Sequence, residues 1–272
     1  ASFDDQHQDS RIRNDGDVTK PLPAVKMLEA QYRVPFLAHA TMEPMNAVAW
    51  LQEDRLDIWT GTQAPTVARD QAAALAGLDS SKVFVHTQLM GGGFGRRAES
   101  DYVLQAVHLA MAMKGKPVKL TWDRKEDMTQ DQYRPAAVAR MRGATAEGTV
   151  QLLDVRVASP SVLESQGGRL GIAMPGPDKL IAEGTYDQPY DITNYRATGY
   201  RTPALLPISS WRSVGNSYNG FFMECFMDEL AAQAGTDPMK LRLSLINHES
   251  SRKVLMAVAE MSNWDKPLSK GR

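Results

Sequence analysis

The stretch best suited to hold a ligand is Gly91 to Gly95, in which four of five residues are glycine. Glycine lacks a Cβ and tolerates positive φ, so backbone N–H groups in such a loop can approach a bound molecule closely. If the loop opens a helix, the free N–H groups of the first turn favour an anion. Arg96 and Arg97 add two cations at the same point. The residues indicate either a cradle for an anionic cofactor or a plain turn between a strand and a helix.

The loop lacks the spacing of the common nucleotide-binding motifs. A dinucleotide fingerprint would need glycine at positions 91, 93 and 96, but position 96 is arginine. A P-loop would end in Gly-Lys-Ser/Thr, whereas Gly95 is followed by two arginines. On the residues alone, the cradle and the turn are equally supported.

Composition excludes several classes of partner and site. The 272 residues carry 31 basic and 32 acidic side chains, and this balance argues against a nucleic-acid partner or an anionic membrane. No apolar run approaches the roughly 18–20 residues that a membrane-spanning helix needs, so we expect no membrane insertion. The single cysteine, Cys225, excludes an internal disulfide and a zinc or iron–sulfur site built from cysteines of this chain.

The elements that must position the loop alternate between strand and helix patterns, which predicts an α/β fold with mixed sheets, made of two packed α/β halves. We expect residues 1–31 to be a linker or the tail of an upstream domain, 32–147 the first half and 148–272 the second. Residues 159–190 read as a long loop with at most short helices. Strands are expected at 32–36, 47–51, 55–60, 82–87, 117–122, twice within 137–158 and at 193–201; helices at 65–75, 98–113, 219–234, from 238, and from a cap at 250 or 251 to 261.

Four motifs follow one another in an order that resembles a known family. They are His39-Ala-Thr-Met-Glu-Pro-Met-Asn46, Trp59-Thr-Gly-Thr-Gln63, Met90-Gly-Gly-Gly-Phe-Gly-Arg-Arg97 and Ser210-Trp-Arg-Ser-Val-Gly215. Together they resemble the molybdenum-binding subunit of the xanthine dehydrogenase/aldehyde oxidase family. The branch that looks most similar is the isoquinoline 1-oxidoreductase beta-subunit type, also found in membrane-linked bacterial aldehyde dehydrogenases. The resemblance extends from about residue 32 to 264.

The resemblance implies a molybdenum-containing molybdopterin, in this branch usually the cytosine dinucleotide form. It implies hydroxylation of an aldehyde or an N-heterocycle with oxygen drawn from water. Electrons would leave through iron–sulfur clusters in a separate small subunit, with a cytochrome c as a further acceptor, and the lone cysteine fits that division. The branch often carries a twin-arginine export signal that would lie outside this chain, so a periplasmic and a cytoplasmic location both fit.

The resemblance also assigns residues to the cofactor. The family loop that lies against the molybdenum centre corresponds to Gly92, Gly93, Phe94 and Gly95. Arg212 corresponds to an arginine beside the pterin, which we expect to be buried. No protein side chain is expected to bind the metal directly. Arg96 would face cofactor phosphate or solvent, and Gln63 would either bond the pterin or cap the following turn. The cofactor-binding residues expected are Gln63, Gly92, Gly93, Phe94, Gly95, Arg96, Trp211, Arg212 and Ser213.

Other polar residues are better explained by structure than by chemistry. We expect His39 to be a hydrogen-bonded core histidine and Glu43 to bond backbone in a turn. The acidic residues of the helix at 219–234 should cap it, form salt bridges or face solvent, and its methionines should pack in the core. Two positions depart from the family: Leu37 stands where a glutamine often lies near molybdenum, and Ala98 where many members have glutamate. Both put a purine substrate in doubt.

The catalytic base of the family is a glutamate in a Gly-x-Gly-Glu motif, which this sequence does not contain. We therefore expect no catalytic residue here and interpret the chain as part of a larger molybdenum hydroxylase, inactive without the remaining part of its large subunit. The alternative is a non-catalytic binding or scaffold module that kept the fold and lost the chemistry.

Overall fold

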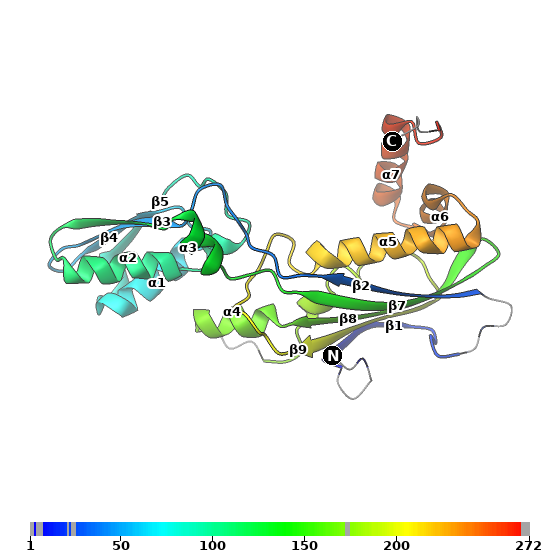
Figure 1. Ribbon diagram of the computed structural model, residues 1–272, viewed down its shortest axis with the longest axis horizontal. Coiled ribbons are helices and arrows are strands. Elements are labelled where there is room, and N and C mark those ends of the chain that lie inside the picture. Colours follow the sequence, from blue (N-terminus) through cyan, green and yellow to red (C-terminus); the bar gives the residue numbers. More distant parts are fainter. Residues whose placement is uncertain (1–2, 4–7, 21, 23–25, 172–174, 268–272) are drawn as a thin grey trace.

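Two β-sheets lie end to end in an elongated molecule, each covered by helices (Figure 1). The structure is a computed structural model that describes residues 3, 8–20, 22, 26–171 and 175–267. The expected α/β fold with mixed sheets is confirmed. None of the described helices is both long and apolar enough to cross a membrane.

The smaller lobe is a four-stranded sheet in the order β5-β4-β3-β6. Strands β4 and β5 run parallel because helix α1 connects them, and the other pairs are antiparallel. Helix α1 begins at a proline and ends at Gly77 in the left-handed conformation, as the sequence predicts. The elements are β3 (Asn46–Leu51), β4 (Leu56–Thr60), α1 (Pro65–Ala76), β5 (Val83–Thr87), α2 (Asp101–Ala112) and β6 (Pro117–Thr121).

The larger lobe is a five-stranded sheet in the order β1-β9-β8-β7-β2. Helix α5 packs on one face, and its buried Phe222, Met223, Phe226 and Met227 contribute to the core of the lobe together with side chains of the sheet. These methionines are core residues, as expected. The elements are β1 (Ser10–Asp15), β2 (Lys26–Val34), β7 (Ala137–Ala146), β8 (Thr149–Pro160), β9 (Asn194–Thr202) and α5 (Asn216–Ala234).

The remaining helices are shorter or lie after α5 in the sequence. Asp237 caps α6 as expected, but His248, rather than a serine, caps α7. Helix α7 projects away from the body of the protein (Figure 1) and has no buried residue. These elements are α3 (Arg124–Thr129), α4 (Val162–Leu170), α6 (Pro238–Leu245), α7 (Glu249–Ser262) and the 3₁₀ turns Ser80–Lys82, Arg96–Ala98 and Lys179–Ala182.

The sheets divide the chain differently from the expected halves. The small lobe is inserted between β2 and β7, which pair with each other, so position 147 falls in the β7–β8 hairpin. Residues 10–15, expected in a linker, form the edge strand β1 against β9. The sequence pattern missed β1 because strand pairing uses backbone groups, and an edge strand can carry polar side chains.

Candidate functional site

The glycine loop follows β5 and lies where the small lobe meets the large one. Three of its residues have positive φ: Gly92 at 104°, Gly95 at 106° and Phe94 at 54°. The loop leads into the 3₁₀ turn Arg96–Ala98, and α2 begins only at Asp101. The expectation that the loop opens the long helix directly is therefore wrong. The chain makes this extra turn where both arginine side chains point into the protein.

Three consecutive N–H groups of the glycine loop are left without an acceptor in the described chain. The N–H of Gly91 donates to Glu43 Oε2 at 2.9 Å, and that of Gly95 donates to Gln63 Oε1 at 3.0 Å. The N–H groups between them, of Gly92, Gly93 and Phe94, have no hydrogen-bond acceptor among the described residues. Adjacent N–H donors of this kind can bind an anion or a polar ligand atom.

Arg97 supports the glycine loop from the interior of the protein. Its guanidinium, with 0% of the side chain exposed, donates to the Gly92 carbonyl at 2.8 Å and to Glu43 Oε2 at 2.8 Å. A further hydrogen bond reaches the Glu43 carbonyl at 3.0 Å. Glu43 therefore bonds backbone in a turn, as expected, and is also the counter-ion of Arg97.

Arg96 is likewise internal. Its side chain is 1% exposed and makes two hydrogen bonds to Asp101, at 2.7 and 2.8 Å. A second carboxylate, Asp131, lies 3.0 Å from Nε. The expectation that Arg96 faces cofactor phosphate or solvent is thus corrected, because two carboxylates satisfy its charge inside the protein. The position of Asp131 could not be recognised from the sequence, since it follows the short helix α3 without a motif.

We predict that Arg97→Ala destabilises the protein by about 3–5 kcal/mol, because it leaves Glu43 and two backbone carbonyls without their buried donor. Urea unfolding of the chain measures this. The matched control is Arg69→Ala, since the Arg69–Asp70 ion pair is exposed, and its loss should cost less than about 1 kcal/mol. Equal effects of the two substitutions would contradict the prediction.

A second loop, residues 210–215, lies beside the glycine loop and precedes α5. Ser213 and Val214 have positive φ, 71° and 47°. A β-branched residue is strained in this conformation, and such strain is often found at functional sites. The Trp211 indole N–H is buried and has no hydrogen-bond partner in the described chain. Arg212, expected to be buried, is exposed and makes no ion pair or hydrogen bond with any described residue.

The two loops touch at one point. A Cβ built on Gly95 would lie 1.8 Å from the Ser210 carbonyl oxygen, so only glycine permits this approach. His39 is a buried, hydrogen-bonded histidine, as expected, and its Nε2 lies 3.2 Å from the same oxygen. The structure thus brings Ser210, at the start of the second loop, to the glycine loop, although more than a hundred residues separate it from Gly95 in the sequence.

Gln63 belongs to this group by another route. Its side chain fixes Gly95, and its amide oxygen would be 2.6 Å from a Cβ on Gly93. Its backbone N–H donates to the Arg97 carbonyl at 2.9 Å. Gln63 therefore supports the glycine loop through Gly95, and its side chain does not cap the following helix, which was one of the two alternatives expected for it.

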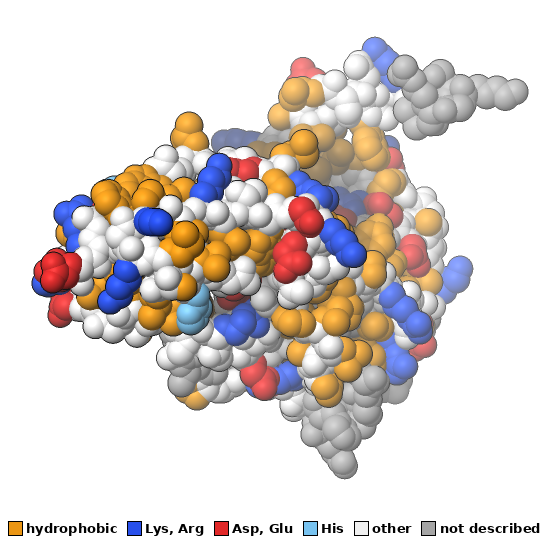
Figure 2. Space-filling model, turned by 60° about the vertical axis from the view of Figure 1, so that its left-hand side comes forward, with side chains coloured by type: hydrophobic (Ala, Val, Ile, Leu, Met, Phe, Trp, Pro, Cys, Tyr) orange, Lys and Arg blue, Asp and Glu red, His pale blue; other side chains and the backbone are white. Residues whose placement is uncertain are grey.

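Apolar side chains surround the loops. Figure 2 looks toward the small lobe, where apolar side chains lie among scattered charges. Leu89 and Met42 are almost fully exposed, at 98% and 88%, and Phe94 is partly exposed. Leu205, on the approach to the second loop, is 82% exposed. The polar donors of the site therefore lie in an apolar surface.

Two carboxylates of the site have lowered pKa values. Burial raises the pKa of Asp131, but hydrogen bonds from His39 and the charge of Arg96 outweigh it and lower the pKa below its ordinary range. For Glu43, burial is likewise outweighed by hydrogen bonds from Gly91 and Asn46 and by the charge of Arg97. Both carboxylates are therefore ionised at neutral pH.

We predict that Asp131 contributes stability that is lost in acid. Its folded pKa lies below the unfolded value of about 3.9, so the contribution is complete above that pH and disappears as the pH falls through the folded pKa. Asp131→Asn should therefore be less stable than wild type at pH 7, by about 3 kcal/mol, and this difference in stability should narrow as the pH falls below about 3.9. The exposed Asp265→Asn should show no such gap in the same unfolding experiment. A gap constant with pH would refute the assignment.

The acidic residues of α5 are structural, as expected. Glu224 and Asp228 form ion pairs with Arg242 at 2.8 and 2.6 Å, and Glu229 accepts a hydrogen bond from Tyr32. Leu37, one of the two positions at which the sequence departs from the family pattern, is partly exposed, and its backbone pairs with that of Arg134 in an isolated β-bridge.

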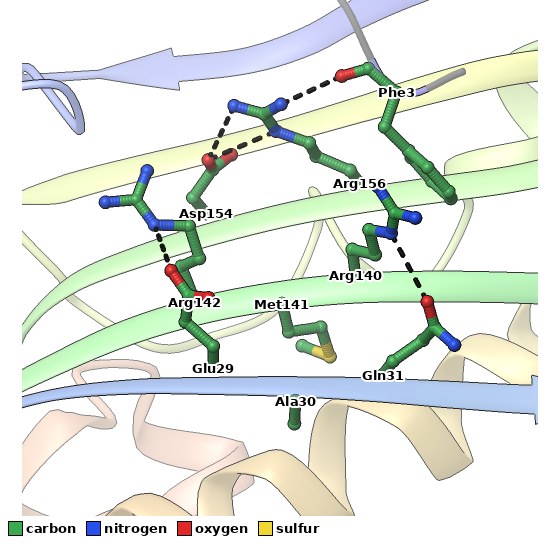
Figure 3. A pocket seen from close by; sticks show the side chains of 9 residues that line it. All are labelled: Phe3, Glu29, Ala30, Gln31, Arg140, Met141, Arg142, Asp154 and Arg156. Carbon is green, nitrogen blue, oxygen red and sulfur yellow. Dashed lines mark hydrogen bonds and ion pairs between the residues drawn. The ribbon is translucent and has the colours of Figure 1, made fainter.

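A cavity of about 740 Å³ lies elsewhere, on the face of the large sheet opposite α5. Charged side chains point into it and bind one another (Figure 3), as in the pairs Arg142–Glu29 and Arg156–Asp154. Its lining includes no residue of the two loops. It is therefore separate from the candidate site.

Comparison with known proteins matches the family described as the molybdopterin cofactor-binding domain to residues 3–245. The isoquinoline 1-oxidoreductase subunit beta of Brevundimonas diminuta is 30% identical over 252 residues, covering 89% of this chain and 31% of that protein. The membrane-bound aldehyde dehydrogenase [pyrroloquinoline-quinone] of Gluconacetobacter polyoxogenes is 29% identical and covers 89% and 32%. The chain thus spans about a third of the length of these relatives.

Solved structures share the fold. Quinoline 2-oxidoreductase from Pseudomonas putida 86 superposes with a TM-score of 0.73 at 20% identity, covering 88% of this chain and 33% of that one. The aldehyde oxidoreductase from Desulfovibrio gigas superposes with a TM-score of 0.70 at 24% identity, covering 86% and 26%.

Proposed function

Because the chain belongs to the molybdopterin cofactor-binding domain family, we propose that it holds molybdopterin in a hydroxylase that oxidises an aldehyde or an N-heteroaromatic compound. The names of its relatives, an isoquinoline oxidoreductase and an aldehyde dehydrogenase, support this substrate class. The observation that carries the proposal is the row of N–H groups at Gly92, Gly93 and Phe94 without an acceptor in the described chain, in a loop that meets Ser210, two residues before the exposed Arg212.

The chain's residues fit such a cofactor. The phosphate and the pterin of this group need donors, and the site offers free N–H groups, an arginine without a described partner and the orphaned Trp211 N–H. When bound, molybdopterin supplies the metal that takes electrons from the substrate. The glycine loop would bind beside the metal, while Arg212, Trp211 and Ser213 would hold the pterin or the phosphate. We propose the cytosine dinucleotide form, following the branch that the sequence resembles.

In this proposal the chain's own residues bind and orient, and none acts as the base. The base would come from the remaining part of the large subunit, and water would supply the oxygen. Electrons would pass to a small iron–sulfur subunit and then to an acceptor such as cytochrome c. The exposed apolar side chains around the loops, including Leu89 and Phe94, fit a site that other parts of a larger enzyme cover.

The proposal is tested by molybdenum and pterin analysis of the complete enzyme that contains this chain, purified with its partners. We expect the wild type to carry both, and Gly93→Val to lose most of each, because valine would press on Gln63 and screen the free N–H groups. The control is Gly168→Val, since Gly168 is exposed and a Cβ there meets nothing within 4 Å. Absence of metal and pterin in the wild type would favour the alternative, a non-catalytic scaffold.

A further inference from the structure

A buried histidine links the body of the protein to the second loop. The His39 side chain is 1% exposed. Its Nδ1 lies 3.0 and 3.2 Å from the two carboxylate oxygens of Asp131, and its Nε2 lies 3.2 Å from the Ser210 carbonyl oxygen. Ser210 directly precedes Trp211 and Arg212, so the ring is fastened to the segment that carries the exposed arginine.

Both neighbours of the ring are acceptors. A backbone carbonyl can only accept, and the ionised form of Asp131 is favoured by the Arg96 guanidinium, 3.0 Å away, and by the backbone N–H of His39, which donates to Oδ2 at 2.5 Å. A neutral imidazole has a single N–H, so either tautomer would leave one ring nitrogen facing an oxygen without a proton between them. The imidazolium form, with two N–H groups, satisfies both contacts. A neutral ring would keep its one proton on Nδ1, where the hydrogen bond to a carboxylate is stronger, and would lose its bond to the Ser210 carbonyl.

The surrounding charges balance a protonated ring. Asp131 is shared between His39 and Arg96, and Arg96 is also paired with Asp101. With His39 charged, two cations face two carboxylates. With His39 neutral, one negative charge is left over in a group of which only Asp101, 33% exposed, reaches solvent, and burying an unbalanced charge is costly. The other charged groups near Arg96 and Asp131 are paired with partners of their own: Asp127 with Arg124, and Glu99 with Arg169.

The Ser210 hydroxyl donates to Gln166 Oε1 at 2.7 Å, whereas the Ser210 carbonyl depends on His39. His39 Nε2 is its only hydrogen-bond donor among the described residues. The same oxygen presses on Gly95, where a Cβ would come within 1.8 Å. A shift of Ser210 therefore changes how the second loop lies against the glycine loop.

We propose that His39 is a positioning residue whose protonated ring fastens the loop of Trp211 and Arg212 against the glycine loop, and whose deprotonation releases that loop. The link to cofactor retention rests on the proposed function, but the fastening itself does not. The pairing of the two loops should then depend on pH through one buried imidazole.

The fluorescence of Trp211 reports on the loop without any cofactor. The chain has five tryptophans, so the signal of Trp211 is obtained as the difference between wild type and Trp211→Phe across pH 5–9. In parallel, ¹⁵N NMR of labelled histidine follows the His39 ring, whose resonances are those missing in His39→Gln. We expect the Trp211 signal and the His39 ring to titrate with the same midpoint. In His39→Gln the Trp211 titration should vanish, since an amide donates an N–H but does not titrate.

The proposal is overturned if His39 titrates while the Trp211 signal stays constant, or if the Trp211 titration survives in His39→Gln. If His39→Gln does not fold, the wild-type midpoints still decide, with the His39 resonances assigned by through-bond NMR. Molybdenum retention by the complete enzyme, measured after gel filtration over the same pH range, should fall along the same curve. Constant retention with a moving loop would overturn the link to the cofactor; a complete enzyme that never contains molybdenum would overturn the proposed function and leave the Trp211 test standing.

Discussion

Gly95→Ala should lower the stability of the protein by several kcal/mol and disrupt the contact between its two loops. Gly95 has a φ of 106°, which costs an L-residue about 1–2 kcal/mol. The added Cβ would also lie 1.8 Å from the Ser210 carbonyl oxygen, which is backbone and cannot rotate away. Separating the loops would stretch the hydrogen bond from His39 to that oxygen as well.

Gly115→Ala is the matched control for this substitution. Gly115 also has a positive φ, 77°, but a Cβ there meets nothing within 4 Å. Both variants carry the backbone strain, so the difference between them measures the clash, which we expect to add on the order of 3 kcal/mol. Thermal and urea unfolding give the two values. If the variants are equally stable, Ser210 does not press on Gly95 and the described contact is wrong.

Arg212→Ala should lower cofactor loading with almost no change in the stability of the protein. The side chain is exposed and has no partner among the described residues, so the fold does not depend on it. A hydrogen bond to a charged ligand group contributes about 1.5–3 kcal/mol, which corresponds to a loss of roughly ten- to a hundredfold in affinity. Molybdenum and pterin content of the complete enzyme, with the melting temperature of the same sample, tests both halves of the prediction.

Two further variants separate charge from geometry at this position. Arg33→Ala removes another exposed arginine, on β2, that makes no described ion pair, and should leave loading intact. Arg212→Lys keeps the charge but not the planar fork, and should retain part of the loading. Normal loading in Arg212→Ala would show that this arginine does not touch the cofactor.

The helices and strands of the small lobe were largely predictable from sequence, because their signals are local. Period-2 alternation marked β4, and Pro65 with Gly77 marked the ends of α1. The division between lobes was not predictable in this way. It depends on β2 pairing with β7 across the whole small lobe, and no local pattern records such a partner.

In the candidate site, too, the residues with a local sequence motif were predictable and those that depend on distant contacts were not. The glycine loop and the 210–215 loop were found from their motifs, and the structure brings them together at Gly95 and Ser210. Arg96 was misjudged because sequence gives the charge of a side chain but not its direction. Asp131 was missed because a single aspartate after a short helix carries no signal until Arg96 and His39 are seen to meet on it.

The insertion of the small lobe also affects how the chain can fold. Strands β2 and β7 are separated by roughly 100 residues, since Val34 pairs with Ala137, and closing so long a loop is slow. Within the insertion, however, Asn46 pairs with Thr121. Once the small lobe has formed from its own contacts, its two ends lie side by side, and the open loop shortens to the two connecting segments. The folded small lobe thus brings β2 close to β7, so we expect these two strands to pair after the small lobe has formed.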